Sequence, residues 1–163
     1  MAITAKEKEL VAVGISVATG CKPCTDYHFK AVRKVRASDE EIRQAVFDAL
    51  SVRESATKIM EAYALAHLGK NPHGSESSSS GEANRIKELV SIGAAFGVNC
   101  VSSLEKHLAA AKSMNIPSED VATILKLAEF IKGKAASHVK RLAGTSLEEE
   151  QLPAYQEEVG GCS

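Results

Sequence analysis

The sequence has few aromatic residues and no long uninterrupted hydrophobic stretch. Only 4% of its 163 residues are aromatic and none is tryptophan, whereas 44% are hydrophobic. The core must therefore be aliphatic, and its alanines and leucines favour helix. Every apolar stretch is interrupted well short of the roughly 20 residues that span a bilayer, so we expect no membrane-spanning segment.

The sequence also lacks an excess of charge of either sign. It carries 20 lysines and arginines against 21 aspartates and glutamates, a formal net charge of −1. Nucleic acid and a membrane surface are therefore not expected partners. The opening MAITAKEKELVAV lacks the pattern of a secretory signal, so we expect a cytoplasmic protein. In that reducing compartment the four cysteines are more often redox groups or metal ligands than structural disulfides.

Two parts of the sequence are copies of each other. A shift of 79 positions aligns KELVAVGISVATGCKPCTDYHFKA with KELVSIGAAFGVNCVSSLEKHLAA without a gap, and it places Gly14 on Gly93. We interpret this as a tandem duplication. It predicts four segments: a first repeat (1–69), a flexible Ser-rich linker (70–82), a second repeat (83–144) and an acidic C-terminal tail (145–163).

Three helices are predicted in each repeat. In the first repeat they cover about residues 4–19, 22–36 and 39–68, with a break at Gly20 and a capping box formed by Ser38 and Glu41. Residues 11–17 alternate as a strand would, but the second copy breaks that alternation. The sequence therefore predicts an all-α fold built from two tandem copies of a three-helix unit.

A CxxC motif lies at the predicted start of the second helix. Cys21 and Cys24 can form a disulfide across one turn, and the helix N-terminus favours a thiolate. His28 lies on the same helical face, where it can take a proton from a thiol. Glu9 lies at a similar height on the preceding antiparallel helix, so its carboxylate can orient the imidazole. The four side chains are therefore the candidate catalytic residues.

The spacing Glu9–x11–Cys21–x2–Cys24–x3–His28 resembles the active-site signature of the AhpD-like alkyl hydroperoxidases, within the carboxymuconolactone decarboxylase superfamily. The resemblance covers residues 4–144. It implies an AhpD-like helical fold, attack of Cys24 on a peroxide, resolution by Cys21, and proton relay by Glu9 and His28. It also implies a homotrimer or another homo-oligomer.

We therefore expect a thiol-dependent oxidoreductase that reduces hydroperoxides, disulfides or both. No nucleotide-binding motif is found in the sequence, so electrons would come from an external dithiol or a thioredoxin-like donor. No cofactor is expected beyond the redox-active Cys21–Cys24 disulfide.

The second repeat holds a degenerate copy of the site, composed of Glu88, Cys100, Ser103 and His107. With serine at the second cysteine position it cannot close a local disulfide. We interpret it as a decayed site retained for packing, with an auxiliary thiol as the alternative. The remaining cysteine and histidines are interpreted as incidental, structural or surface residues: Cys162, His67, His73 and His138.

Two other functions stay open at this point. One is a lyase of the carboxymuconolactone decarboxylase type that uses His and Glu, although paired thiols argue against it. The other is a non-catalytic helical module stabilised by zinc on the CxxC motif and His28, although structural zinc prefers four ligands. A thioredoxin-like site would need a strand before the motif, and the sequence predicts none.

Overall fold

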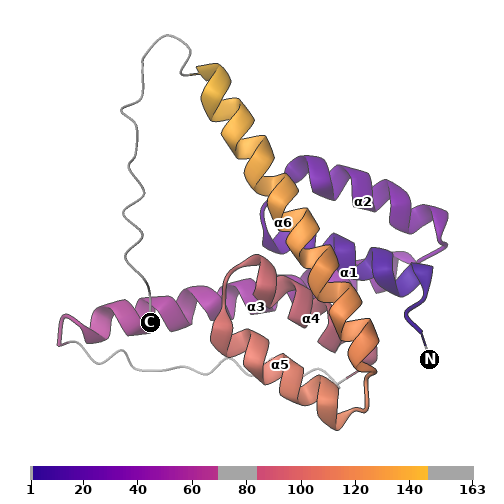
Figure 1. Cartoon of the computed structure of the whole chain (residues 1–163), viewed down its shortest axis with the longest axis horizontal. Helices are drawn as coiled ribbons and strands as arrows, with labels where there is room; N and C mark the ends of the chain where they lie inside the picture. Colours follow the sequence, from indigo (N-terminus) through magenta and orange to yellow (C-terminus); the bar gives the residue numbers. More distant parts are fainter. Residues whose placement is uncertain (1, 70–83, 147–163) are drawn as a thin grey trace.

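The computed structural model describes residues 2–69 and 84–146, which form six helices and contain no strand (Figure 1). This confirms the predicted all-α fold and the repeated three-helix unit. The predicted linker and the tail beyond residue 146, with His73 and Cys162, lie outside the described residues. The helices are α1 (Ala5–Ala18), α2 (Lys22–Lys34), α3 (Asp39–Ala66), α4 (Arg85–Gly97), α5 (Val101–Ser113) and α6 (Ser118–Ser146). None of these six helices combines the length and apolarity needed to cross a membrane.

The turns between helices have the same backbone conformation in both repeats. Gly20, after α1, has φ of 71°, and Asn99 has φ of 58° at the equivalent position after α4. Arg36 and Asn115, after α2 and α5, have φ of 58° and 56°. Gly and Asn tolerate this left-handed region better than other residues do. Arg36 adopts it without that advantage, two residues before Ser38, the N-cap of α3.

One ion pair is also duplicated. Lys6 contacts Glu41 at 2.5 Å in the first repeat, and Arg85 contacts Asp120 at 2.6 Å at the equivalent positions of the second. Each pair ties the start of the repeat's first helix to the first turn of its third helix. The guanidinium of Arg85 holds the pKa of Asp120 below its usual range. The three-helix unit is therefore repeated in its polar contacts as well as in its helices.

The C-terminal ends of α1 and α4 are capped in the same way. Arg53 of α3 donates from Nη1 to the carbonyl of Ala18 at 2.8 Å. Lys132 of α6, at the equivalent position, donates from Nζ to the carbonyl of Phe96 at 3.3 Å. Cations at this end of a helix donate hydrogen bonds to its unpaired carbonyls and are attracted to the negative end of its dipole.

Helices α1 and α4 cross at the centre of the molecule and are buried on nearly all sides. Two glycines stand at the crossing. A Cβ on Gly14 would lie 2.7 Å from Val90 Cγ1, and one on Gly93 would lie 2.7 Å from Ile15 Cδ1. Such contacts are shorter than van der Waals packing permits. The two helices can therefore approach this closely only because both positions lack a side chain.

The third helix of each repeat packs on the other repeat as well as on its own. Helix α3 contacts α4 and α5 of the second repeat, and α6 contacts α1 and α2 of the first. In Figure 1, α6 runs from the region of α5 across the molecule to α2. The two repeats therefore share one core, and α6 passes beside the helix that carries the CxxC motif.

Substitution at the crossing is expected to destabilise the fold. Gly14→Ala and Gly93→Ala should each lower the free energy of unfolding by about 1–3 kcal/mol, because the added methyl group overpacks the contact between α1 and α4. Urea denaturation followed by circular dichroism measures this.

Gly133→Ala in α6 is the matched control. A Cβ at Gly133 meets no atom within 4 Å, so this change should stabilise the helix by about 0.5–1 kcal/mol. Equal destabilisation by all three substitutions would contradict a specific role for the crossing.

Candidate active site

Cys21 and Cys24 are joined by a disulfide at the start of α2. Cys21 is the N-cap residue, and its Sγ accepts a hydrogen bond from the backbone N–H of Cys24 at 3.3 Å. Both cysteines are buried. The unpaired N–H groups of the first turn place partial positive charge on this motif. This environment stabilises a thiolate when the disulfide is reduced.

Glu9 and His28 form a hydrogen-bonded pair between α1 and α2. The distance from His28 Nδ1 to Glu9 Oε2 is 3.0 Å. The carboxylate can only accept, so Nδ1 donates, and the neutral ring keeps its lone pair on Nε2. The rings of Tyr27 and His28 are perpendicular, with centroids 5.0 Å apart. The predicted juxtaposition of Glu9 and His28 is present, and it leaves His28 arranged as a base.

His138 of α6 lies beside the two sulfur atoms. A ring nitrogen of His138 and the two Sγ atoms all lie within 4.8 Å of one another. The ring Nδ1 is 3.2 Å from Nη2 of Arg141, one turn further along α6. The sequence pattern predicts a structural or surface role for His138, and the structure adds that it lies beside the two sulfurs. No spacing in the sequence could have revealed it, because its proximity depends on how α6 packs across α2.

Two thiolates and an imidazole are a ligand set that suits zinc or another thiophilic metal. The zinc alternative from the sequence assigned His28 as the third ligand. In the structure the histidine grouped with the sulfurs is His138, whereas His28 is paired with Glu9. His67, the C-cap residue of α3, lies exposed against the ring of Tyr63.

The second repeat retains the same carboxylate–imidazole pair without the second sulfur. His107 Nδ1 is 2.8 Å from Glu88 Oε2, and Glu88 is buried. The free thiol of Cys100 donates to the hydroxyl of Ser103 at 3.1 Å. This arrangement can hold a single thiol but cannot form a disulfide within α5.

Asp48 of α3 is a further acidic residue near this second pair. It is buried, and its Oδ1 accepts a hydrogen bond from Gln44 at 2.9 Å. Burial raises the pKa of Asp48, and the nearby charge of Glu88 raises this pKa further, although the Gln44 hydrogen bond opposes the shift. The sequence pattern did not indicate Asp48 as a member of the second site, because Asp48 belongs to the other repeat.

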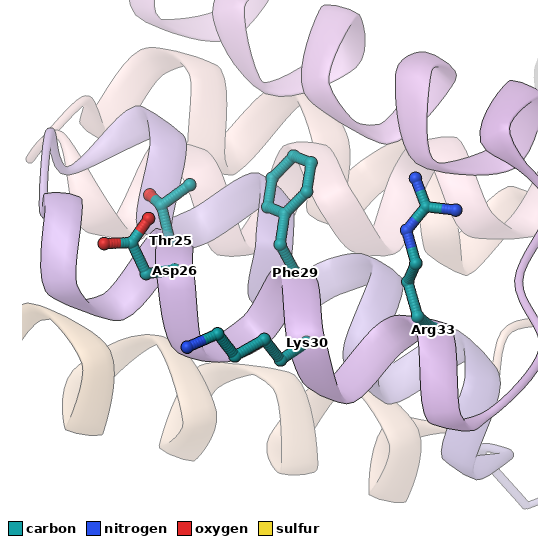
Figure 2. A pocket seen from close by; sticks show the side chains of 5 residues that line it. All are labelled: Thr25, Asp26, Phe29, Lys30 and Arg33. Carbon is teal, nitrogen blue, oxygen red and sulfur yellow. The ribbon is translucent and has the colours of Figure 1, made fainter.

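An open groove follows α2 away from the dithiol (Figure 2). Its lining residues are Thr25, Asp26, Phe29, Lys30 and Arg33. The hydroxyl of Thr25 donates to the carbonyl of Cys21 at 2.9 Å, so one end of the groove adjoins the motif. In Figure 2 the side chains of Phe29 and Arg33 point to the same side of α2.

Comparison with known proteins gives one match. Residues 2–67 match the family model described as the carboxymuconolactone decarboxylase family. This range covers α1, α2 and α3, and it contains the complete four-residue signature. No curated protein and no solved structure matches the chain.

Replacing Asp48 by asparagine is expected to stabilise the protein at neutral pH. A carboxyl group whose pKa is raised in the folded state costs stability once the pH exceeds the pKa of the same group in the unfolded chain, about 3.9. Asp48→Asn removes that cost and keeps an acceptor for Gln44. Its melting temperature should therefore exceed that of the parent at pH 7, and the difference should vanish as the pH falls to 4.

The exposed Asp26 offers a control, since Asp26→Asn should leave the melting temperature unchanged at both pH values. A lower melting temperature for Asp48→Asn at pH 7 would show that the Asp48 charge is stabilising.

Proposed function

We propose that the chain is a thiol-dependent oxidoreductase that reduces hydroperoxides or disulfides at Cys21 and Cys24. The match of residues 2–67 to the carboxymuconolactone decarboxylase family model supports this proposal. The observation that carries this proposal is the buried Cys21–Cys24 disulfide in the same helix as a Glu-oriented histidine. A lyase that uses only His and Glu has no need for the two sulfurs. The second repeat keeps such a Glu–His pair but lacks the dithiol.

Cys24 is the attacking residue in this proposal. His28 follows it by four residues on α2, so the two side chains lie on the same helical face. Nε2 of His28 accepts the thiol proton, while Glu9 holds the ring in the required tautomer. The Cys24 thiolate then attacks the terminal oxygen of the hydroperoxide, and the O–O bond breaks. Cys24 becomes a sulfenic acid, and the alkoxide takes the proton from His28 and leaves as an alcohol.

Cys21 completes the cycle. Its sulfur attacks the Cys24 sulfenic acid, the disulfide forms, and one water molecule leaves. A dithiol donor then supplies two electrons and two protons to reopen the disulfide. The donor's attack on Cys24 releases Cys21 as the thiolate, and the N–H of Cys24 and the helix N-terminus stabilise that leaving group.

The groove along α2 is the proposed binding surface for the organic part of the substrate. It begins beside the dithiol and presents the ring of Phe29 together with the cations of Lys30 and Arg33. Arg33 is paired with Asp39 at 2.7 Å, which leaves Lys30 as the cation to meet an anionic substrate group. This combination favours an amphipathic hydroperoxide or disulfide over a small polar one.

We also propose that the chain forms a homo-oligomer. The C-terminal turns of α3 and α6 extend beyond the neighbouring helices in Figure 1. Large apolar side chains are exposed on these turns and directly after α3, namely Ile59, Met60, Tyr63, Leu68, Val139 and Leu142. Apolar surface of this kind on projecting helices is typical of a surface buried against another protein. A second copy of the chain is the proposed occupant, in agreement with the family resemblance.

Substitutions at the first site should separate the proposed roles. Cys24→Ser should abolish peroxide-dependent oxidation of a thioredoxin-coupled donor. His28→Ala should lower kcat/KM by about 10²–10⁴, because general base catalysis contributes that much. Glu9→Gln should lower it less, since the amide can still bond the ring. Steady-state turnover with a panel of peroxides and disulfides measures these effects.

The second repeat supplies the matched controls. Cys100→Ser and Glu88→Gln make equivalent changes outside the dithiol site, and kcat/KM should stay within about twofold of the parent. Turnover that survives Cys24→Ser and Cys21→Ser would rule out dithiol chemistry.

Association should depend on the exposed apolar turns. Met60→Asp combined with Tyr63→Asp should reduce the molar mass measured by light scattering to that of a single chain, because it places two charges in the buried contact. Glu61→Lys also changes the charge of the same helix by two, with the opposite sign and on another face, and should leave the mass unchanged. A parent protein that is already monomeric would contradict the proposal.

A further inference from the structure

The grouping of Cys21, Cys24 and His138 has the dimensions of a metal site. Three atoms no more than 4.8 Å apart share a point that lies within about 2.8 Å of each. Zinc bonds to sulfur at about 2.3 Å and to imidazole nitrogen at about 2.0–2.1 Å. Side-chain adjustments of less than about 1 Å therefore bring all three ligands onto one ion. We propose that the reduced dithiol and His138 bind Zn²⁺.

The donor set and its burial select the ion. Two thiolates and an imidazole favour zinc over calcium or magnesium, which prefer oxygen ligands. Cys21 is 5% exposed and Cys24 is 8% exposed. A pair of thiolates in so buried a place is costly unless its charge is balanced. A divalent cation balances both negative charges and leaves a neutral complex.

His138 supplies the third ligand of the proposed site. Arg141 can only donate, so Nδ1 of His138 accepts its hydrogen bond in this structure. A metal ligand must be an unprotonated ring nitrogen, so binding requires either that the ion replaces Arg141 at Nδ1 or that the ring proton moves from Nε2 to Nδ1. His28 is paired with Glu9, and the group of three ligand atoms within 4.8 Å of one another contains His138 and not His28. The third ligand therefore comes from the second repeat and joins the two halves of the molecule through the ion.

The site exists only in the reduced protein. In the structure the two sulfurs are bonded to each other, and each must become a thiolate before it can bind an ion. A dithiol reductant supplies two electrons and two protons to break the disulfide. Zinc then displaces both protons as two Zn–S bonds form. The disulfide and the metal complex are mutually exclusive states of the same two sulfurs.

Zinc would accordingly inhibit the redox cycle, since a metal-bound thiolate is withdrawn from attack on an oxidant. This consequence rests on the proposed function, whereas metal binding itself does not. Binding is therefore measured directly, so that a failure of the peroxidase proposal and a failure of the metal proposal are told apart.

The test uses the full chain carrying Cys100→Ser and Cys162→Ser, so that the dithiol is the only source of thiols. The protein is reduced, freed of reductant without oxygen and titrated with Co²⁺ as a spectroscopic probe. A thiolate-to-cobalt charge-transfer band should saturate at one equivalent, and Zn²⁺ should displace the cobalt. His138→Ala should weaken Zn²⁺ binding at least tenfold in a chelator competition, whereas His138→Cys should retain it.

His67→Ala is the matched control, because His67 is an exposed histidine at the end of α3, the equivalent helix of the other repeat, and this variant should bind Zn²⁺ like the parent. Circular dichroism establishes that each variant is folded. The proposal is overturned if the reduced protein shows no thiolate–cobalt band, if the oxidised protein binds as tightly as the reduced one, or if His138→Ala leaves the affinity unchanged. Loss of binding in His28→Ala alone would overturn it in favour of the other histidine.

Discussion

The close crossing of α1 and α4 is the contact on which the other parts of the structure depend. Gly14 and Gly93 let the two helices meet without intervening side chains. The same helices carry Glu9 and Glu88, the carboxylates that orient the two histidines. Because both site carboxylates stand on the crossing helices, the packing at the centre also fixes the height of each carboxylate opposite its imidazole.

Duplication has produced two sites with the same carboxylate–imidazole pair and different chemistry. Both retain the carboxylate–imidazole pair, with N–O distances of 3.0 and 2.8 Å. Only the first has two sulfurs at the start of the second helix. Among the described residues, His138 of the opposite repeat lies beside these sulfurs. Helix α3 contributes the buried acid Asp48 near the second pair instead. The exchanged third helices therefore give the two sites different surroundings.

The sequence by itself determined the helices, the repeat and the pairing within each repeat. Capping residues such as Ser38 and the turn at Gly20 act through neighbouring backbone groups, so their effect can be predicted from the local sequence. The Glu9–His28 contact lies across one helical hairpin, where the rise per residue fixes the height of both side chains. A change of the second cysteine to Ser103 likewise shows directly that the second site cannot close a disulfide.

Only the tertiary structure decided what crosses between the repeats. His138 is 114 positions from Cys24 along the chain, and its proximity depends on the angle at which α6 passes over α2. The equivalent residue of the first repeat is Ile59, so the duplication gave no hint of it. Asp48 is a similar case, because Glu88 and His107, which lie near it, belong to the other repeat. Such contacts arise from the packing of whole helices, which depends on the complete core. The spacing of residues within a short stretch of sequence therefore does not predict them.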